Sequence, residues 1–212
     1  MGHRYTRGEV EGRLRATIST GRAIIVAGAG NGLSAICAER GGIDLVVVYN
    51  SGKFRVDGLP SICGLMPYGN ANEIVLDLGA NHVIPAIKQT PVLAGVCGTD
   101  PTRSMQKFLE LLCEAGFSGV INYPTVSRFD GNIRRDLESV GLGFAREVEM
   151  IAIARDVGLY ATSYVRTVEE SAEMAKAGVD VIVPHVGLTS GRTTGLESAI
   201  SLDEAAKATE EL

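Results

Sequence analysis

The feature that most limits the fold of this chain is a regular alternation of short apolar runs with helical patterns. The apolar runs cover 23–30, 44–50, 91–97, 119–124, 159–165 and 180–186. They lack the apolar–polar alternation of a half-exposed strand, and continuous apolar strands are typical of parallel sheets that are covered on both faces. Because helical segments lie between the runs, the sequence predicts consecutive strand–helix–strand units.

The segments between the runs supply the expected helices and one long loop. Helices are predicted over 32–40, 70–88, 101–115, about 143–157 and 168–177, and over a last segment that Ser201 caps with Glu204 as its capping-box partner. Residues 51–69 are rich in glycine and proline and are predicted as a loop. A further helix is expected over 8–19, so that residues 1–20 close the floor of the sheet.

One helix-to-strand joint recurs at 39–50, 114–123 and 176–185, each time with a glycine suited to a left-handed helix end. This repetition favours a barrel over an open sheet. We therefore predict a single domain over 1–212, a parallel TIM-type (βα)8-like barrel whose sequence ends after about six of the usual eight units. Six units cannot close such a barrel. Either a second copy covers the open flanks, giving a homo-oligomer, or the sequence is part of a longer protein.

Composition limits the partners. The net charge is −5 and the pI is near 5.3, which argues against a general nucleic-acid or anionic-membrane surface but not against a small anionic metabolite in a local pocket. No apolar run approaches the roughly 18 residues of a membrane span. The four cysteines form no CxxC pair and are interpreted as reduced thiols, which with the absence of an apolar leader predicts a cytoplasmic location.

In a parallel barrel, the functional site lies at the carboxyl ends of the strands. That rule selects polar residues and glycines that follow the predicted strands, and we expect them to converge on one rim. The catalytic candidates are Asn50, Asp100, Asn122, Tyr164 and His185, and the substrate-binding candidates are Gly28, Gly30, Ser51, Arg55, Thr125, Arg128, Gly187 and Thr189.

Several of these candidates also have a purely structural interpretation. The run Gly28–Gly32 lacks the third glycine of a dinucleotide fingerprint because Leu33 stands there, so it is either a tight turn or a set of backbone amides for an anion. Asp100 precedes Pro101 and is either a helix N-cap or a ligand of Mg²⁺. His185 is either a satisfied core residue or a functional group at a strand end.

Six segments in order resemble one known family, at 49–55, 65–72, 91–101, 116–125, 147–151 and 185–189. Together they are similar to the phosphoenolpyruvate hydrolase-like family of TIM-barrel proteins, which also matches the C-terminal domain of plant antiviral proteins of the Tm-1 type. The resemblance implies a substrate of the phosphoenolpyruvate or phosphonopyruvate type and a lyase or hydrolase assisted by a divalent metal, Mg²⁺. Ser127 and Arg128 stand where it leads us to expect a glycine and an apolar residue.

Two other functions remain open at this point. A non-catalytic TIM barrel could bind a ligand or a partner in signalling. An aldolase-like barrel would use a lysine inside a strand for a Schiff base. The lysines considered for that role lie in predicted loops or helices, which disfavours this mechanism; they are Lys53, Lys88, Lys107, Lys176 and Lys207.

Overall fold

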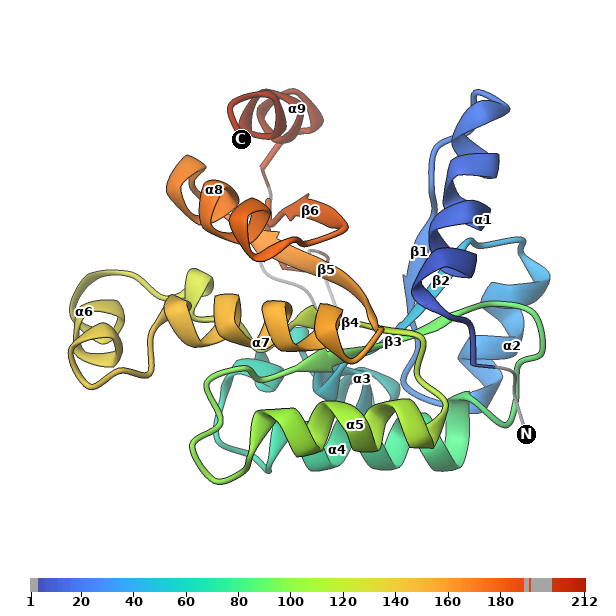
Figure 1. Cartoon of the computed structure of the whole chain (residues 1–212), viewed down its shortest axis with the longest axis horizontal. Helices are drawn as coiled ribbons and strands as arrows, with labels where there is room; N and C mark the ends of the chain where they lie inside the picture. Colours follow the sequence, from blue (N-terminus) through green and yellow to red (C-terminus); the bar gives the residue numbers. More distant parts are fainter. Residues whose placement is uncertain (1–3, 189–190, 192–199) are drawn as a thin grey trace.

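The computed structural model describes residues 4–188, 191 and 200–212, and within them the predicted strands form one parallel sheet. The strands are β1 (Val26–Gly28), β2 (Leu45–Val48), β3 (Val92–Val96), β4 (Gly119–Asn122), β5 (Tyr160–Val165) and β6 (Val181–Pro184). They pair in chain order, and each pair is parallel. Figure 1 shows them following an arc from β1 near α1 to β6 near α9, so the α/β fold is confirmed as a curled half-barrel.

The helices lie between the strands as the alternating pattern predicts. They are α1 (Arg7–Ser19), α2 (Gly32–Arg40), α3 (Asn50–Val56), η1 (Ser61–Leu65), α4 (Ala71–Asp77), η2 (Leu78–Val83), α5 (Met105–Ala115), η3 (Val126–Arg128), α6 (Gly131–Ser139), α7 (Phe144–Asp156), α8 (Val168–Ala177) and α9 (Leu202–Glu210). The Ser201–Glu204 capping box is confirmed. Within the described ranges, no helix is long and apolar enough to cross a membrane.

The loop predicted over 51–69 is wrong, because α3 and the 3₁₀ helix η1 occupy much of it. The loop was predicted partly from its glycines, but one of them, Gly52, lies inside α3. A Cβ atom on Gly52 would lie 2.9 Å from the Cα of Gly30, so glycine is needed here for close backbone packing against the turn after β1. The glycines of this stretch therefore do not all mark turns.

Two other helix predictions need correction. The helix after β3 begins at Met105 rather than at Pro101, and the side chain of Ser104 caps it by accepting a hydrogen bond from the amide of Lys107. Asp100 is therefore not the N-cap of this helix. The helix α6 was missed because its residues are mostly polar and none is buried, so the sequence gives no apolar stripe to detect.

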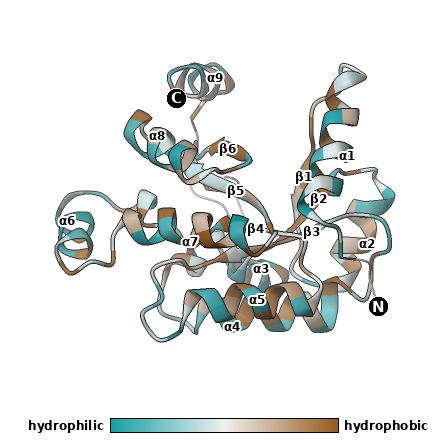
Figure 2. Cartoon of the chain, viewed as in Figure 1, coloured by the Kyte–Doolittle hydropathy of each residue, from teal (hydrophilic) through white to brown (hydrophobic). Residues whose placement is uncertain are grey.

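The core consists of two layers, one on each face of the sheet. Between the strands and the surrounding helices lie alternate strand residues such as Val46, Ala94 and Val120. On the concave face, alternate residues of β2 to β5 pack with Val10 and Leu14 of α1. In Figure 2, hydrophobic brown runs through the central strands, whereas hydrophilic teal gathers on the outer turns of α4 and α5.

The helix α1 lies at the end of the sheet where the strands begin. Its buried residues share a cluster with Leu45 and Tyr160, the first residues of β2 and β5. An ion pair of 2.6 Å joins Arg7 of α1 to Asp180, directly before β6. The carboxylate of Asp180 also accepts a hydrogen bond from the amide of Ala161, so α1 is fixed to the β5–β6 side of the arc.

The two outer strands each have one partner in the described sheet. At the start of β1, the residues Ile25 and Val26 are 55% and 48% exposed. An apolar cavity of about 340 Å³ opens on the concave face, lined by residues that include Val26, Val47, Ile121 and Val183. Unpaired strand edges with exposed apolar side chains favour association, so a homo-oligomer remains our prediction for this chain.

We expect the 212-residue chain to sediment as an oligomer at micromolar concentration and Val26→Lys to shift it toward monomer, because a lysine on an edge strand opposes pairing. Ile133→Lys on α6 is the matched control, since Ile133 is 59% exposed but lies far from the sheet edge in sequence and structure. A wild-type monomer with a cooperative thermal transition would contradict this prediction.

Candidate active site

Aromatic side chains from four strand ends form a cluster on the concave face. The hydroxyl groups of Tyr49 and Tyr164 lie 2.7 Å apart. The ring of Tyr123 packs edge-on against Tyr49 at 5.2 Å between centroids, and His185 packs edge-on against Tyr164 at 4.7 Å. These four residues, with Ser51, line a cavity of about 110 Å³. The cluster places phenolic hydroxyl groups and an imidazole around a space suited to a small ligand.

One arginine lines this cavity, and the charges of two others act on His185, which also lines it. Arg55 lines it directly. Arg128 follows β4 in η3, and its Nε atom is buried without a hydrogen-bond partner in the described part of the chain. Burial lowers the pKa of Arg128, and the positive charge of Arg166, which directly follows β5, lowers it further. The carboxylate of Asp130 opposes part of this effect, but the half-buried guanidinium keeps an unpaired Nε atom, so this arrangement favours an anionic ligand.

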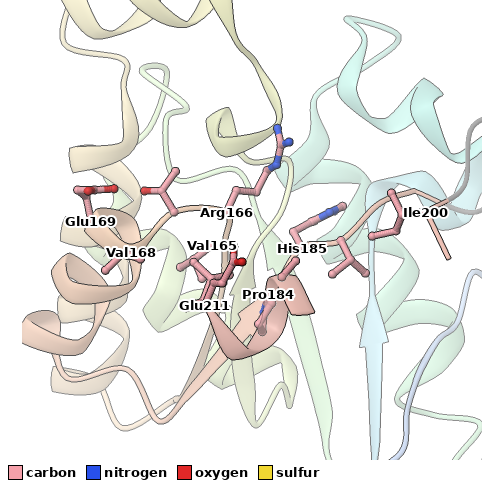
Figure 3. A pocket seen from close by; sticks show the side chains of 12 residues that line it. Val165, Arg166, Val168, Glu169, Pro184, His185, Ile200 and Glu211 are labelled. Carbon is pink, nitrogen blue, oxygen red and sulfur yellow. The ribbon is translucent and has the colours of Figure 1, made fainter. Parts of the chain in front are cut away.

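His185 directly follows β6 and is 9% exposed. Its Nδ1 atom is buried and has no hydrogen-bond partner among residues 4–188, 191 and 200–212. Burial lowers the pKa of His185 to about 4, and the charges of Arg128 and Arg166 add to this effect. The imidazole is therefore neutral at pH 7. Figure 3 shows His185 and Arg166 on neighbouring strand ends, where they line a neighbouring pocket of about 460 Å³ that Glu169 borders on its other side.

Asn122 and Thr125 meet a buried carboxylate behind the sheet. The Nδ2 group of Asn122 donates to Oε2 of Glu147 at 2.6 Å, and the hydroxyl of Thr125 donates to the same atom at 2.7 Å. The Oδ1 atom of Asn122 accepts a hydrogen bond from the amide of Tyr164. Burial raises the pKa of Glu147 to about 7, against the effect of its hydrogen-bond donors. These side chains hold β4, β5 and α7 together.

Asn50 and Asp100 line a second cavity, of about 400 Å³, which lies among the loops and which Thr125 also borders. The Nδ2 group of Asn50 donates to the carbonyl of Gly64 at 2.8 Å, and its buried Oδ1 atom lacks a partner in the described structure. Burial opposes ionisation of Asp100, but hydrogen bonds from Thr102, Asn72 and Arg103 hold the pKa of this carboxyl well below its usual value.

The other predicted binding residues have varied positions. Gly28 lies in β1, where a Cβ atom would come within 3.3 Å of the Tyr49 ring. A Cβ atom on Gly30 would collide with the carbonyl oxygen of Gly52, so Gly30 serves packing against α3. Ser51 hydrogen-bonds Tyr123, and Gly187 lines the 110 Å³ cavity. Thr189 lies outside the described residues.

The structure therefore divides the predicted site residues into two groups. Those at the 110 Å³ cavity are Tyr164, His185, Ser51, Arg55 and Gly187, with Arg128 close by. Those beyond the sheet or at the second cavity are Asn50, Asp100, Asn122 and Thr125. Sequence analysis missed Arg166, although it comes two residues after Tyr164 and the strand-end rule could have selected it. It also missed Glu147, because a helical glutamate gives no signal of full burial.

The described residues include no preformed cluster of metal-binding side chains. Within the described ranges, no group of three or more histidine, cysteine, aspartate or glutamate side chains could hold a metal ion. Asp100, the predicted Mg²⁺ ligand, accepts hydrogen bonds from Asn72, Thr102 and Arg103 at 2.5 to 3.1 Å. A metal at Asp100 would have to displace these donors, and the nearby carboxylate of Glu73 is paired with Arg103 at 3.5 Å.

A curled parallel half-barrel with polar groups at its strand ends defines a TIM-type α/β protein, which is the class the sequence predicts. The family model described as phosphoenolpyruvate hydrolase-like matches residues 9–212. The chain belongs to that family, and the resemblance seen in the sequence is confirmed.

The chain is 52% identical over 192 residues to the ToMV resistance protein Tm-1(GCR237) of Solanum lycopersicum, covering 91% of this chain and 25% of that protein. It thus spans about a quarter of this relative. Two solved structures share its fold. Phosphonopyruvate hydrolase, in complex with oxalate and Mg²⁺, has a TM-score of 0.64 at 15% identity, over 95% of this chain and 68% of that one. Oxaloacetate acetylhydrolase, in complex with the product oxalate, has a TM-score of 0.60 at 15% identity, over 98% and 70%.

We expect Glu147→Gln to lower the free energy of unfolding by about 1–3 kcal/mol, because the new amide group would face donors that now bind the carboxylate and leave at least one of them unsatisfied. Urea unfolding measures the change. Glu149→Gln is the matched control on the same helix, since Glu149 is 58% exposed at its side chain. Equal stability losses in the two variants would refute a structural role for the Glu147 network.

The lowered pKa of His185 gives a second prediction. Between about pH 6.5 and pH 4 the unfolded chain binds a proton at this site that the folded chain does not, so stability falls as the pH falls. From pH 7 to pH 5, the wild type should lose about 1–2 kcal/mol more than His185→Gln. The exposed His82 gives the control variant His82→Gln. Parallel losses in wild type and His185→Gln would show that His185 titrates normally.

Proposed function

We propose that this chain binds a small anion of the phospho- or keto-acid type at the 110 Å³ cavity and acts on it as a lyase or hydrolase. The observation that carries the proposal is the buried Nε atom of Arg128, which has no partner among the described residues, in a guanidinium whose charge acts on His185. A guanidinium recognises a carboxylate or phosphoryl group through paired hydrogen bonds. The ligand should therefore carry at least one such group.

The proposed roles follow from the chemistry of each side chain. Arg55, Arg128 and Arg166 supply positive charge for the anion. The paired hydroxyl groups of Tyr49 and Tyr164 can donate a hydrogen bond to a developing negative charge. The neutral imidazole of His185 can accept a proton, and a bound anion would raise its pKa toward a more effective value.

The family and the fold neighbours support the reaction class. The family is that of phosphoenolpyruvate hydrolase-like proteins, and the two fold neighbours are a phosphonopyruvate hydrolase and an oxaloacetate acetylhydrolase, each holding oxalate. One of them also holds Mg²⁺. Metal assistance was predicted from the sequence, but the described residues include no group of three or more metal-binding side chains, so the proposal contains no metal step. A cytoplasmic location stays a prediction.

The test combines binding and turnover on the full 212-residue chain. We expect oxalate to bind in a calorimetric titration, and phosphonopyruvate, phosphoenolpyruvate or oxaloacetate to be consumed in an assay with and without Mg²⁺. Oxalate binding without any turnover would support the second candidate, a non-catalytic ligand-binding barrel. The unpaired Arg128 Nε and His185 Nδ1 atoms favour a ligand under either candidate. Absence of oxalate binding would overturn the proposed site.

His185 offers a direct reporter of occupancy. We expect saturating oxalate to raise the pKa of His185 above its value near 4, because a negative charge beside the imidazole stabilises its protonated form. A proton NMR titration of the imidazole, assigned with the His82→Gln variant, measures this shift. An unchanged His185 titration in a chain that binds oxalate would place the anion elsewhere.

A further inference from the structure

The strand ends on the concave face carry cations and hydroxyl groups but no carboxylate among the residues that the structure describes. The 110 Å³ cavity is lined by Tyr49, Ser51, Arg55, Ser61, Tyr123, Tyr164, His185, Gly187 and Leu188. Mg²⁺ prefers oxygen ligands and is normally held by one or two carboxylates besides water and substrate. Of the described lining residues, none supplies a carboxylate, so this wall cannot hold Mg²⁺ in the usual way.

Two buried carboxylates close to the site already serve other contacts, whereas the exposed Glu169 lines the neighbouring pocket with His185 and Arg166. Glu170 accepts hydrogen bonds from the Ser127 hydroxyl at 2.6 Å and from the Arg166 amide at 2.8 Å, and it pairs with Arg134 at 3.0 Å. Glu147 is fully buried behind β4, where three donors reach it. Recruiting either carboxylate to a metal would leave several buried donors unsatisfied.

The positive charge that a metal would supply is already present in the arginines. The guanidinium of Arg128 is half-buried, and the structure gives its charge no opposing ion pair within the described ranges. The positive charges of Arg128 and Arg166 both act to lower the pKa of His185. Those of Arg128 and Arg55 both act to lower the pKa of Tyr123, against the larger effect of burial. The half-buried Arg128 and the exposed Arg55 and Arg166 thus act on residues of one small space, in which His185 adds a buried nitrogen that also lacks a partner in the described structure.

We propose that this site binds its carboxylate or phosphoryl ligand without a divalent metal, with the guanidinium of Arg128 in the charge-neutralising role that a metal would otherwise have. This inference rests on the proposed function, and it specifies how the anion is held. The ligand class is a small anion with two adjacent acidic oxygens, which the planar guanidinium can bind through two parallel hydrogen bonds. Arg55 and Arg166 bind the remaining charge.

The experiment measures oxalate affinity by calorimetry on the full chain, once with excess Mg²⁺ and once after chelation with EDTA. We expect the two dissociation constants to agree within about threefold. We also expect Arg128→Gln to weaken oxalate binding about 10- to 100-fold in EDTA, as loss of a charged hydrogen-bond partner does. Arg128→Lys keeps the charge but loses the paired geometry, so it should weaken binding by a smaller factor.

Arg135→Gln is the matched control, because Arg135 is an exposed arginine on α6 and should leave the affinity unchanged. Circular dichroism at the titration temperature confirms that each variant is folded. Binding that requires Mg²⁺ would overturn this inference and leave the proposed function intact. Binding in EDTA that Arg128→Gln does not weaken would overturn the role of Arg128. Failure of oxalate to bind under both conditions would overturn the proposed function as well.

Discussion

Successive side chains of a strand point to opposite faces of the sheet, and this alternation determines what each strand end can do. In β4, Ile121 belongs to the concave-face cluster, whereas the adjacent Asn122 reaches Glu147 on α7. In β5, Tyr164 packs on the concave face beside Tyr49. The strand ends therefore contribute both a ligand-facing aromatic wall and a buried network that fixes the helices, although all of them lie at the same edge of the sheet.

The two sets of polar groups have opposite electrostatic characters. Behind the sheet, the carboxylate of Glu147 is surrounded by donors that satisfy it. On the concave side, Arg128 and His185 each keep a buried nitrogen without a partner in the described part of the chain. Unsatisfied buried groups reduce stability unless a ligand completes them. The satisfied Glu147 network therefore maintains the fold, whereas the unpaired atoms of Arg128 and His185, and that of Asn50 at the 400 Å³ cavity, are positions that a ligand can complete.

The strands and several helices could be predicted because their signals are local. Continuous apolar runs mark β2 to β5, and α8 has the predicted bounds. The site was predicted less well, since the sequence locates a strand end without showing which face its last residues occupy, and a shift of one residue reverses the face. For that reason Asn122 was grouped with His185. The side chain of Asn122 lies behind the sheet with Glu147, whereas that of His185 lies on the concave face with Tyr164. The burial of Glu147 depends on contacts between distant segments and has no local signal.

The central claim is that the ligand lies on the concave side, against the arginines, and not in the larger cavity among the loops. A crystal structure of the full chain with oxalate, grown in the presence of EDTA, tests this placement directly. The account predicts oxalate within hydrogen-bond distance of Arg128 Nε and His185 Nδ1. Oxalate bound instead beside Asn50 and Asp100, in the 400 Å³ cavity, would contradict it.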